Sequence, residues 1–326
     1  MGIVYIAHRL FALHDRMLAA TLADKLANQS NWPIFLPYCD TKEDTVIVPK
    51  KGFYLFQEDV KRLQDLKSLV AILHGPGYDD GVCMEIGFAY RMGVPLVFLT
   101  TDFLTYSFGR DSKQFVMSDP LLEALNAKIL QISDPASEGT ETPNHSKYQQ
   151  FYNRNERSLD YAIDEAVGQV LSVGNQQHVK IPARANKKKV YMEVSPYGFT
   201  EHIDRFKHCV EKMGWEFYCS SRFTQAEVST EEATHRDLHE ALESSILILD
   251  GNGPEVPIGS SVLAGISLAE KKKTILLYTG SQVTHAHGRE ENARNLMLLY
   301  GCSAMAQTPK QAEEMLVSEI LSKSNI

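Results

Sequence analysis

Short apolar segments of strand length alternate along the chain with longer segments in which apolar residues recur every three or four positions. The short segments predict buried β-strands and the longer ones predict amphipathic helices, so their alternation indicates βαβ units and a parallel sheet. In the first part of the chain the expected strands are 3–7, 31–37, 69–73, 96–99 and the end of 121–132, and the expected helices are 12–28, 53–66, 82–92, the start of 121–132 and 157–173.

The same order of elements starts again after residues 175–189, which lack periodicity, contain a central proline and carry five basic residues. We interpret this segment as a linker. The pattern therefore predicts an α/β protein with two tandem domains and parallel sheets, divided into residues 1–175, a linker at 176–189 and residues 190–326. Beyond the linker the expected strands are 190–194, 216–219, 245–249 and 274–278, and the expected helices are 199–213, 231–243, 262–270 and 311–322.

The two halves share glycines and prolines at one spacing. Any two βαβ units can have a glycine-rich loop, so the matching order of all elements carries more weight. Together the two observations predict an internal repeat. Three pairs of residues are each 178 positions apart: Gly81 and Gly259, Gly87 and Gly265, and Pro76 and Pro254.

The repeat is unequal in its acidic residues. If the fold itself required carboxylates at the positions compared below, both halves would carry them. Only the first half does, which suggests that its acids do chemistry. It also suggests that the second half has no nucleophile of its own. The corresponding pairs are Glu85 and Leu263, Asp79 and Pro257, and Asp80 and Ile258.

Glu85 follows the loop after the expected strand 69–73 and lies in the first turn of the expected helix 82–92. Active sites of open α/β sheets lie at the carboxyl ends of the strands, which makes this acid a candidate for chemistry. The alternative is that Glu85 only complements the dipole of the helix.

Composition excludes several classes of protein. The net charge of −8 over 326 residues argues against a protein that binds the phosphate backbone of nucleic acids. Five scattered cysteines lack metal-ligand spacing and predict reduced thiols in a cytoplasmic protein, and the one HxH sequence, His285 and His287, is a weak metal signal. No apolar run approaches the roughly 20 residues of a membrane span, and the N-terminus does not read as a secretory signal, so we expect no membrane partner.

Carboxylates without a metal motif are suited to chemistry at the anomeric carbon of a sugar. One carboxylate attacks this carbon while another protonates the leaving group, and negative charge stabilises the oxocarbenium-like transition state. We expect Glu85 to be the nucleophile, with Asp79 on the preceding loop and Asp59 near the first turn of the preceding helix reaching the same end of the sheet. The alternative for each aspartate is capping or turn formation.

The first half resembles the nucleoside 2-deoxyribosyltransferases over about residues 3–132 and a closing helix near 157–173. A Tyr-x5-Phe pattern runs through the first strand and its exit loop, and an acidic residue precedes the central strand at a family-like spacing. The matching residues are Tyr5 and Phe11, Asp59 twenty residues before Asp79, and the motif D-x-G-x-x-x-E-[IL]-G-[FY]-A as Asp79, Gly81, Glu85, Ile86, Gly87, Phe88 and Ala89.

This resemblance implies tandem Rossmann-like, flavodoxin-like three-layer domains with parallel sheets. It also implies transfer of 2-deoxyribose from a deoxynucleoside donor to a free nucleobase acceptor by double displacement, with no cofactor and no metal. It implies that Glu85 attacks C1′ and forms a glycosyl ester, while Asp59 and Asp79 bind and protonate the base. By the same comparison Tyr5 would orient Glu85, and Phe11 would line the pocket for the sugar or the base.

Members of the family complete each site with an Asn-Leu-Met segment from a neighbouring subunit, and here that segment is residues 295–297 of the second half. The resemblance therefore implies a fused pseudo-dimer with a single site, in which Asn295 and Met297 approach the sugar hydroxyls. Such a fused chain can still form homo-oligomers. The alternative for residues 294–298 is simply a buried strand.

The loop after the first strand departs from the family, which usually has small residues there. This chain has His8 and Arg9, which we include among the candidate substrate-binding residues, and Arg9 could attract a phosphate. Two alternatives therefore stay open: a hydrolase that cleaves the N-glycosidic bond of deoxynucleotides, and a non-catalytic nucleotide-binding sensor. The residues give no role to the insertion 133–156.

Overall fold

The computed structural model describes residues 2–43, 45–108, 113–133, 146–176, 178–179, 181, 187–195, 202–224, 227–280 and 294–324. Its strands form two five-stranded sheets with parallel pairing throughout, which confirms the expected α/β fold class. The chain builds one sheet completely before it begins the other, as the tandem pattern predicts.

The first sheet has the strand order β2-β1-β3-β4-β5. Its central strands are buried on both faces, which explains their continuous apolar sequences. The strands are β1 Ile3–Ala7, β2 Ile34–Phe35, β3 Leu66–Ile72, β4 Leu96–Thr100 and β5 Lys128–Gln131, and the helices are α1 Leu13–Gln29, α2 Pro37–Asp40, α3 Lys51–Leu63, α4 Asp80–Arg91, α5 Pro120–Glu123 and α6 Lys147–Val173.

The second sheet has the order β10-β9-β8-β6-β7. When the strands of each half are counted in chain order, both sheets have the flavodoxin-like arrangement 2-1-3-4-5. The strands are β6 Lys187–Glu193, β7 Glu216–Cys219, β8 Ser244–Asp250, β9 Lys273–Leu277 and β10 Ala304–Ala306, and the helices are α7 Ile203–Lys212, α8 Thr230–Glu243, α9 Ile258–Glu270, α10 Leu296–Gly301 and α11 Pro309–Ser324.

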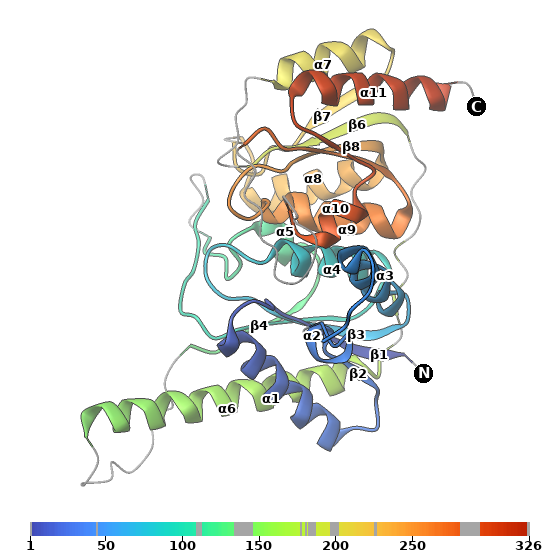
Figure 1. Ribbon diagram of the computed structural model, residues 1–326. Helices are drawn as coiled ribbons and strands as arrows, with labels where there is room; N and C mark the ends of the chain where they lie inside the picture. The colour runs from blue at the N-terminus through green and yellow to red at the C-terminus, as the bar shows by residue number, and fades with distance from the viewer. Residues whose placement is uncertain are drawn as a thin grey trace.

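The two halves stack so that their helices meet in the middle of the molecule (Figure 1). Helices α1 and α6 cover the outer face of the first sheet, and α7 and α11 cover the outer face of the second. One hydrophobic core extends between the sheets through α3, α4, α8, α9 and α10. The halves therefore share a core, as subunits of a permanent dimer do.

Helices α4 and α9 cross at the centre of this shared core. A Cβ at Gly87 would overlap the backbone carbonyl of Val262, and a Cβ at Gly265 would overlap the carbonyl of Met84. These two contacts are reciprocal, because 84 and 262 differ by the same 178 positions as 87 and 265. The predicted repeat spacing thus coincides with a pseudo-two-fold contact in which the two backbones touch.

Several elements differ from the expected ones. Helix α6 begins at Lys147 rather than at residue 157, so the last ten residues of the 133–156 insertion are helical; residues 134–145 lie outside the described part. Strand β6 begins at Lys187, three residues before the expected strand. The helix α10 and the strand β10 were not expected at all, because each is too short to show a period.

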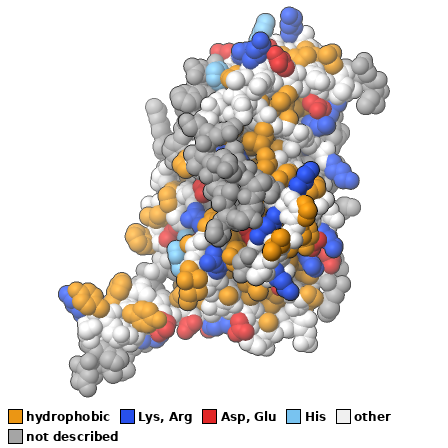
Figure 2. All heavy atoms as spheres, in the orientation of Figure 1, with side chains coloured by type: hydrophobic (Ala, Val, Ile, Leu, Met, Phe, Trp, Pro, Cys, Tyr) orange, Lys and Arg blue, Asp and Glu red, His pale blue; other side chains and the backbone are white. Residues whose placement is uncertain are grey.

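The N-terminal end of α6 projects from the body of the molecule (Figure 1), and Figure 2 shows hydrophobic side chains along this arm. Tyr148, Phe151, Tyr152 and Tyr161 are exposed there. No helix in the described ranges is both long enough and apolar enough to span a bilayer.

Candidate active site

The carboxyl end of the first sheet holds a buried tyrosine and glutamate pair. Tyr5 of β1 is fully buried, and its hydroxyl donates a hydrogen bond to Oε1 of Glu85 over 2.7 Å. Helix α4 begins at Asp80, so Glu85 lies in the second turn and not in the first turn as expected. A carboxylate at that depth lies too far along the helix to act mainly on the exposed amides of its N-terminus.

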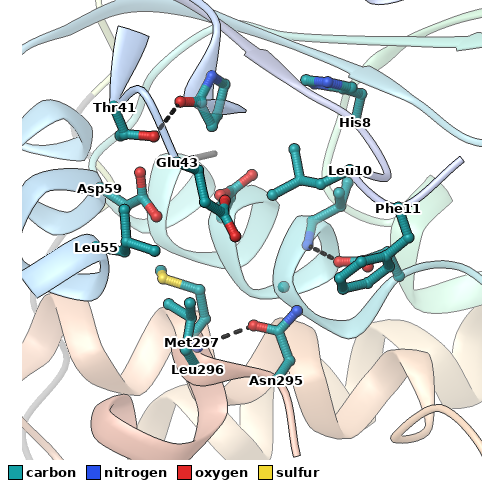
Figure 3. Close-up of a pocket in the computed structure, with 15 residues that line it drawn as sticks. His8, Leu10, Phe11, Thr41, Glu43, Leu55, Asp59, Asn295, Leu296 and Met297 are labelled. Carbon is teal, nitrogen blue, oxygen red and sulfur yellow. Dashed lines mark hydrogen bonds between the residues drawn. The ribbon is translucent and has the colours of Figure 1, made fainter. Parts of the chain in front are cut away.

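Two aspartates line the same small cavity as Glu85. Asp79 is the N-cap of α4, where its Oδ1 accepts a hydrogen bond from the amide of Val82 over 3.0 Å. Asp59 is buried and projects from the middle of α3 rather than from its first turn. Figure 3 shows Asp59 and a further acid, Glu43, directed into the cavity. The three predicted carboxylates thus lie together, Asp59 from α3 and the other two from α4 and its N-cap.

Burial raises the pKa of Glu85 well above its ordinary value, and the negative charge of Asp59 and then that of Asp79 act in the same direction. The hydrogen bond from Tyr5 opposes this shift because it stabilises the carboxylate. Burial also raises the pKa of Tyr5, so the phenol stays protonated and remains a donor. The pair therefore holds a carboxylate in a fixed orientation with little water around it.

The second half supplies one wall of the cavity, beside the start of α4. Asn295 and Met297 both line it, together with Leu296 between them (Figure 3). Asn295 is the N-cap of α10, and its Oδ1 accepts a hydrogen bond from the amide of Met297 over 2.9 Å. This corrects the alternative of a buried strand for residues 294–298, since they form a cap and a short helix.

A side chain at Gly81 would meet the amide group of Asn295, with Nδ2 2.7 Å and Oδ1 3.0 Å from the added Cβ. The glycine at the start of α4 therefore allows the second half to approach the first. The motif residue Gly81 has a packing role here, in addition to its place beside Asp79.

The remaining predicted residues lie at different distances from the cavity. Phe11 is half-exposed at its rim, and His8 lines its wall, where His8 Nδ1 lies 3.2 Å from the carbonyl oxygen of Ile6. Burial lowers the pKa of His8, which favours the neutral imidazole. Arg9 lies beside a neighbouring cavity, where its Nη2 donates to the carbonyl of Gly77 over 3.1 Å.

The cavity has a volume of about 40 Å³, which holds a few water molecules but not a nucleoside. Thr41, Glu43 and Leu55 also line the cavity and were not predicted, because they belong to no motif that marks them as site residues.

The corresponding end of the second sheet has a related but altered arrangement. Tyr191 pairs with Leu247 of β8 as Tyr5 pairs with Leu69 of β3. The hydroxyl of Tyr191 also donates to a carboxylate, but this is Oε2 of Glu193 at the end of its own strand, 2.6 Å away.

Arg222 fills the space beside that second pair. Its guanidinium donates to Asp119 of the first half over 2.9 Å and to Glu193 over 3.1 Å, and it lies 3.5 Å from Asp237. The side chains of Arg222 and Asp237 are fully buried, and the other two are nearly so. Asp237 follows Asp59 by the repeat spacing of 178 residues, so an acid of the first site is retained and now pairs with an arginine.

Within the described residues no group of three or more His, Cys, Asp or Glu side chains is placed to hold a metal ion. His285 and His287 lie outside the described residues. All five cysteines are free thiols.

Residues 4–119 match the model of the nucleoside 2-deoxyribosyltransferase family, so the N-terminal half is similar to this family. A solved structure described as a conserved protein from Enterococcus faecalis V583 is similar at 24% sequence identity, covering 48% of this chain and 99% of that chain with a TM-score of 0.33. No curated protein matches the chain. The family is one of glycosyl-transferring enzymes that act on nucleosides and nucleobases, and the match ends before the second half.

Proposed function

We propose that this chain is a nucleoside 2-deoxyribosyltransferase that uses Glu85 as its nucleophile. The observation that carries the proposal is the buried Glu85 carboxylate, oriented by Tyr5 and lining one cavity with Asp59 and Asp79. A single carboxylate would serve as a cap or a packing residue equally well. An oriented carboxylate beside two more acids has the parts of a double displacement.

In the first step the free oxygen of Glu85, Oε2, attacks C1′ of a deoxynucleoside. The C1′–N bond breaks, its electron pair moves to the nitrogen of the leaving base, and a protonated Asp59 or Asp79 donates a proton to that base. The product is a glycosyl ester of Glu85. The neighbouring negative charge stabilises the oxocarbenium-like transition state.

In the second step a nitrogen of the acceptor base attacks C1′ of the ester. The C1′–O bond breaks and its electron pair returns to Glu85, while the proton lost by the acceptor passes to the aspartate that donated one before. Tyr5 stabilises the carboxylate each time it re-forms, through its hydrogen bond to Oε1. The cycle needs no metal or cofactor.

The site is shared between the two halves in this proposal. Asn295 and Met297, at the start of α10, close one side of the cavity, so the second half contributes to the site although it has Leu263 at the position that repeats Glu85. Replacing Asn295 with Ala is expected to lower the rate of transfer by about 10- to 100-fold through lost substrate positioning. An Asn295→Ala variant with unchanged turnover and an intact fold would exclude the shared site. The matched control is Asn155→Ala on exposed α6.

One assay separates the proposed reaction from its alternatives. The protein is incubated with a 2′-deoxynucleoside, with and without a free acceptor base, and the products are separated by chromatography. Exchange that depends on the acceptor supports transfer. Release of free sugar without exchange indicates a hydrolase, and a requirement for a 5′-phosphate indicates a nucleotide substrate. Tight binding without turnover indicates a sensor.

A further inference from the structure

A second and much larger cavity lies between the two halves. Its volume is about 830 Å³, against about 40 Å³ for the cavity at Glu85, and it falls in the size range of small-molecule sites. The first half contributes the loops after β3 and β4, and the second half contributes the ends of β6 and β8 and the loop before α9. We refer to it as the second cavity.

The place of the second cavity in the fold is that of a binding site. Strands β6 and β8 end at Glu193 and Asp250, and both of these residues line it. This is the carboxyl edge of a parallel sheet beside the strand pair at which the chain order reverses, where open α/β proteins bind ligands. Asp119 enters from the first half, as Asn295 enters the Glu85 cavity from the second. Both residues are helix N-caps.

The walls of the second cavity are rich in flat rings. Tyr78, Tyr106, Phe108 and Phe223 all line it, and the rings of Phe108 and Phe223 meet edge to face with centroids 5.6 Å apart. Rings held in this way offer faces on which a planar heterocycle can stack. Tyr78 comes from the loop after β3 and Phe223 from the segment after β7, so a stacked ligand would contact both halves.

The charges around the second cavity disfavour an anionic ligand. Arg222 is the one basic side chain among its described lining residues, and its guanidinium is already held by Asp119 and Glu193. Asp250 and Glu255 add further carboxylates to the lining. A phosphate would meet these acids without a free cation to pair with.

The lining also offers hydroxyl groups. The backbone amide of Ser118 donates a hydrogen bond to the hydroxyl of Tyr78 over 3.3 Å, and both residues line the second cavity. A hydroxyl group can both donate to and accept from the edge of a heterocycle.

We propose that the second cavity binds an uncharged planar heterocycle of the nucleobase class, either free or as the base of a nucleoside. The site is separate from the Glu85 cavity, and its corresponding carboxylate, Glu193, is held by Arg222, so it binds without turnover. The proposal does not depend on the transferase reaction, because it rests on the rings, charges and position of the second cavity alone.

The test is the stoichiometry of binding, measured by isothermal titration calorimetry with adenine, 2′-deoxyadenosine and 2′-deoxyadenosine 5′-monophosphate as probes. The protein is the full chain with Glu85→Gln, which prevents consumption of the nucleoside. Adding Phe223→Ala is expected to weaken binding at one site by about tenfold or more, because one stacking ring is lost. Adding Phe103→Ala, which removes an exposed phenylalanine outside the cavity, is expected to leave binding unchanged.

If adenine and the deoxynucleoside bind equally tightly at the site that depends on Phe223, the protein recognises the base alone. Tighter binding of the deoxynucleoside indicates that the sugar is held as well, and both results support the site. Binding that is unaffected by Phe223→Ala, or a monophosphate that binds at least as tightly as the nucleoside, overturns it.

If Phe223→Ala does not fold, Ser107→Trp replaces it, since this exposed lining residue can carry a bulky ring into the mouth without disturbing the core. Loss of transfer in the chromatographic assay with retained Phe223-dependent binding would contradict only the proposed reaction. Retained transfer without that binding would contradict only the second site.

Discussion

The two tyrosine and carboxylate pairs, Tyr5 with Glu85 and Tyr191 with Glu193, occupy corresponding ends of two sheets with the same strand order. In the first pair the carboxylate comes from a helix and lines a cavity with other acids. In the second it comes from the strand and is held by Arg222. The tyrosine is common to both, so the source and the partner of the carboxylate distinguish the two sites.

This difference separates reactivity from stability. No salt bridge among the described residues involves Glu85. Only the hydrogen bond from Tyr5 stabilises its charge, while burial and the neighbouring acids raise its pKa. Glu193 is neutralised by a buried arginine that also holds Asp119 of the other half. A carboxylate with a permanent cation is a poor nucleophile but a good crosslink between domains.

The largest expected effect separates the two glutamates. Glu85→Gln keeps the shape of the side chain and an acceptor for Tyr5 but removes the nucleophile, so transfer is expected to fall by about 10⁴-fold. Glu193→Gln is expected to lower transfer far less and to lower stability instead, because Arg222 loses a charged partner. Turnover assays and urea unfolding of both variants measure this, and equal losses of transfer would refute the distinction.

Glu85→Gln is also expected to change the stability of the protein. Because the pKa of Glu85 is raised on folding, its contribution is fully present below its unfolded pKa and is lost as the pH rises through the folded value. Glu85→Gln does not titrate, so it is expected to be more stable than the natural protein at neutral pH. The advantage should shrink as the pH falls from neutral and should be absent below about pH 4, where Glu85 is protonated in the folded and the unfolded protein.

Arg222→Met tests the buried ionic cluster. It leaves Asp119, Glu193 and Asp237 without their cation, and we expect a loss of about 3–5 kcal/mol in the free energy of unfolding. The control is Arg205→Met, whose exposed pair with Glu313 should contribute no more than about 1 kcal/mol. If the urea unfolding curves of both variants shift equally, the buried cluster contributes no more to stability than the exposed pair does.

Gly87→Ala tests the helix crossing. The new methyl group would overlap the carbonyl of Val262 and push α4 and α9 apart, so a loss of about 1–3 kcal/mol is expected. Gly168→Ala on α6 is the matched control, because a Cβ there meets nothing within 4 Å. This substitution should raise the free energy of unfolding by roughly 0.5–1 kcal/mol. Thermal unfolding measures both, and a stable Gly87→Ala variant would contradict the close contact.

The smallest expected effect is a shift in pH dependence. Asp59 raises the pKa of Glu85 through its negative charge, so Asp59→Asn should move the acid limb of kcat/KM to lower pH, by about one unit or less. The position of the limb is the readout, because the height of the profile falls for any residue that contacts the base. A limb that stays in place or moves to higher pH would show that the two carboxylates do not interact.

The sequence predicted most strands and long helices because their apolar patterns are continuous and their ends carry glycine or proline. The short helix α10 was not predicted, because Leu296–Gly301 is less than two turns long and its apolar residues fit a strand equally well. Its N-cap, Asn295, was nevertheless identified from the family resemblance. Glu85 was placed one turn too early, because Asp80 reads as loop and is in fact the first residue of α4.

The buried cluster around Arg222 could not be predicted from the sequence. Its partners Asp119, Glu193 and Asp237 are 103, 29 and 15 residues away, and no local period joins them. An isolated arginine in a polar segment resembles any solvated residue, and only the tertiary structure reveals that its charge is buried. The larger cavity could not be predicted either, because its walls come from loops of both halves that lie far apart in the sequence.

The crossing of α4 and α9 within one chain has a further consequence. A site completed by a separate subunit empties on dilution, whereas here the residue that completes the Glu85 cavity is tethered to it. The tether gives Asn295 a fixed effective concentration at the site. Specific activity should therefore stay constant however far the protein is diluted, and each half can change its sequence without changing the other.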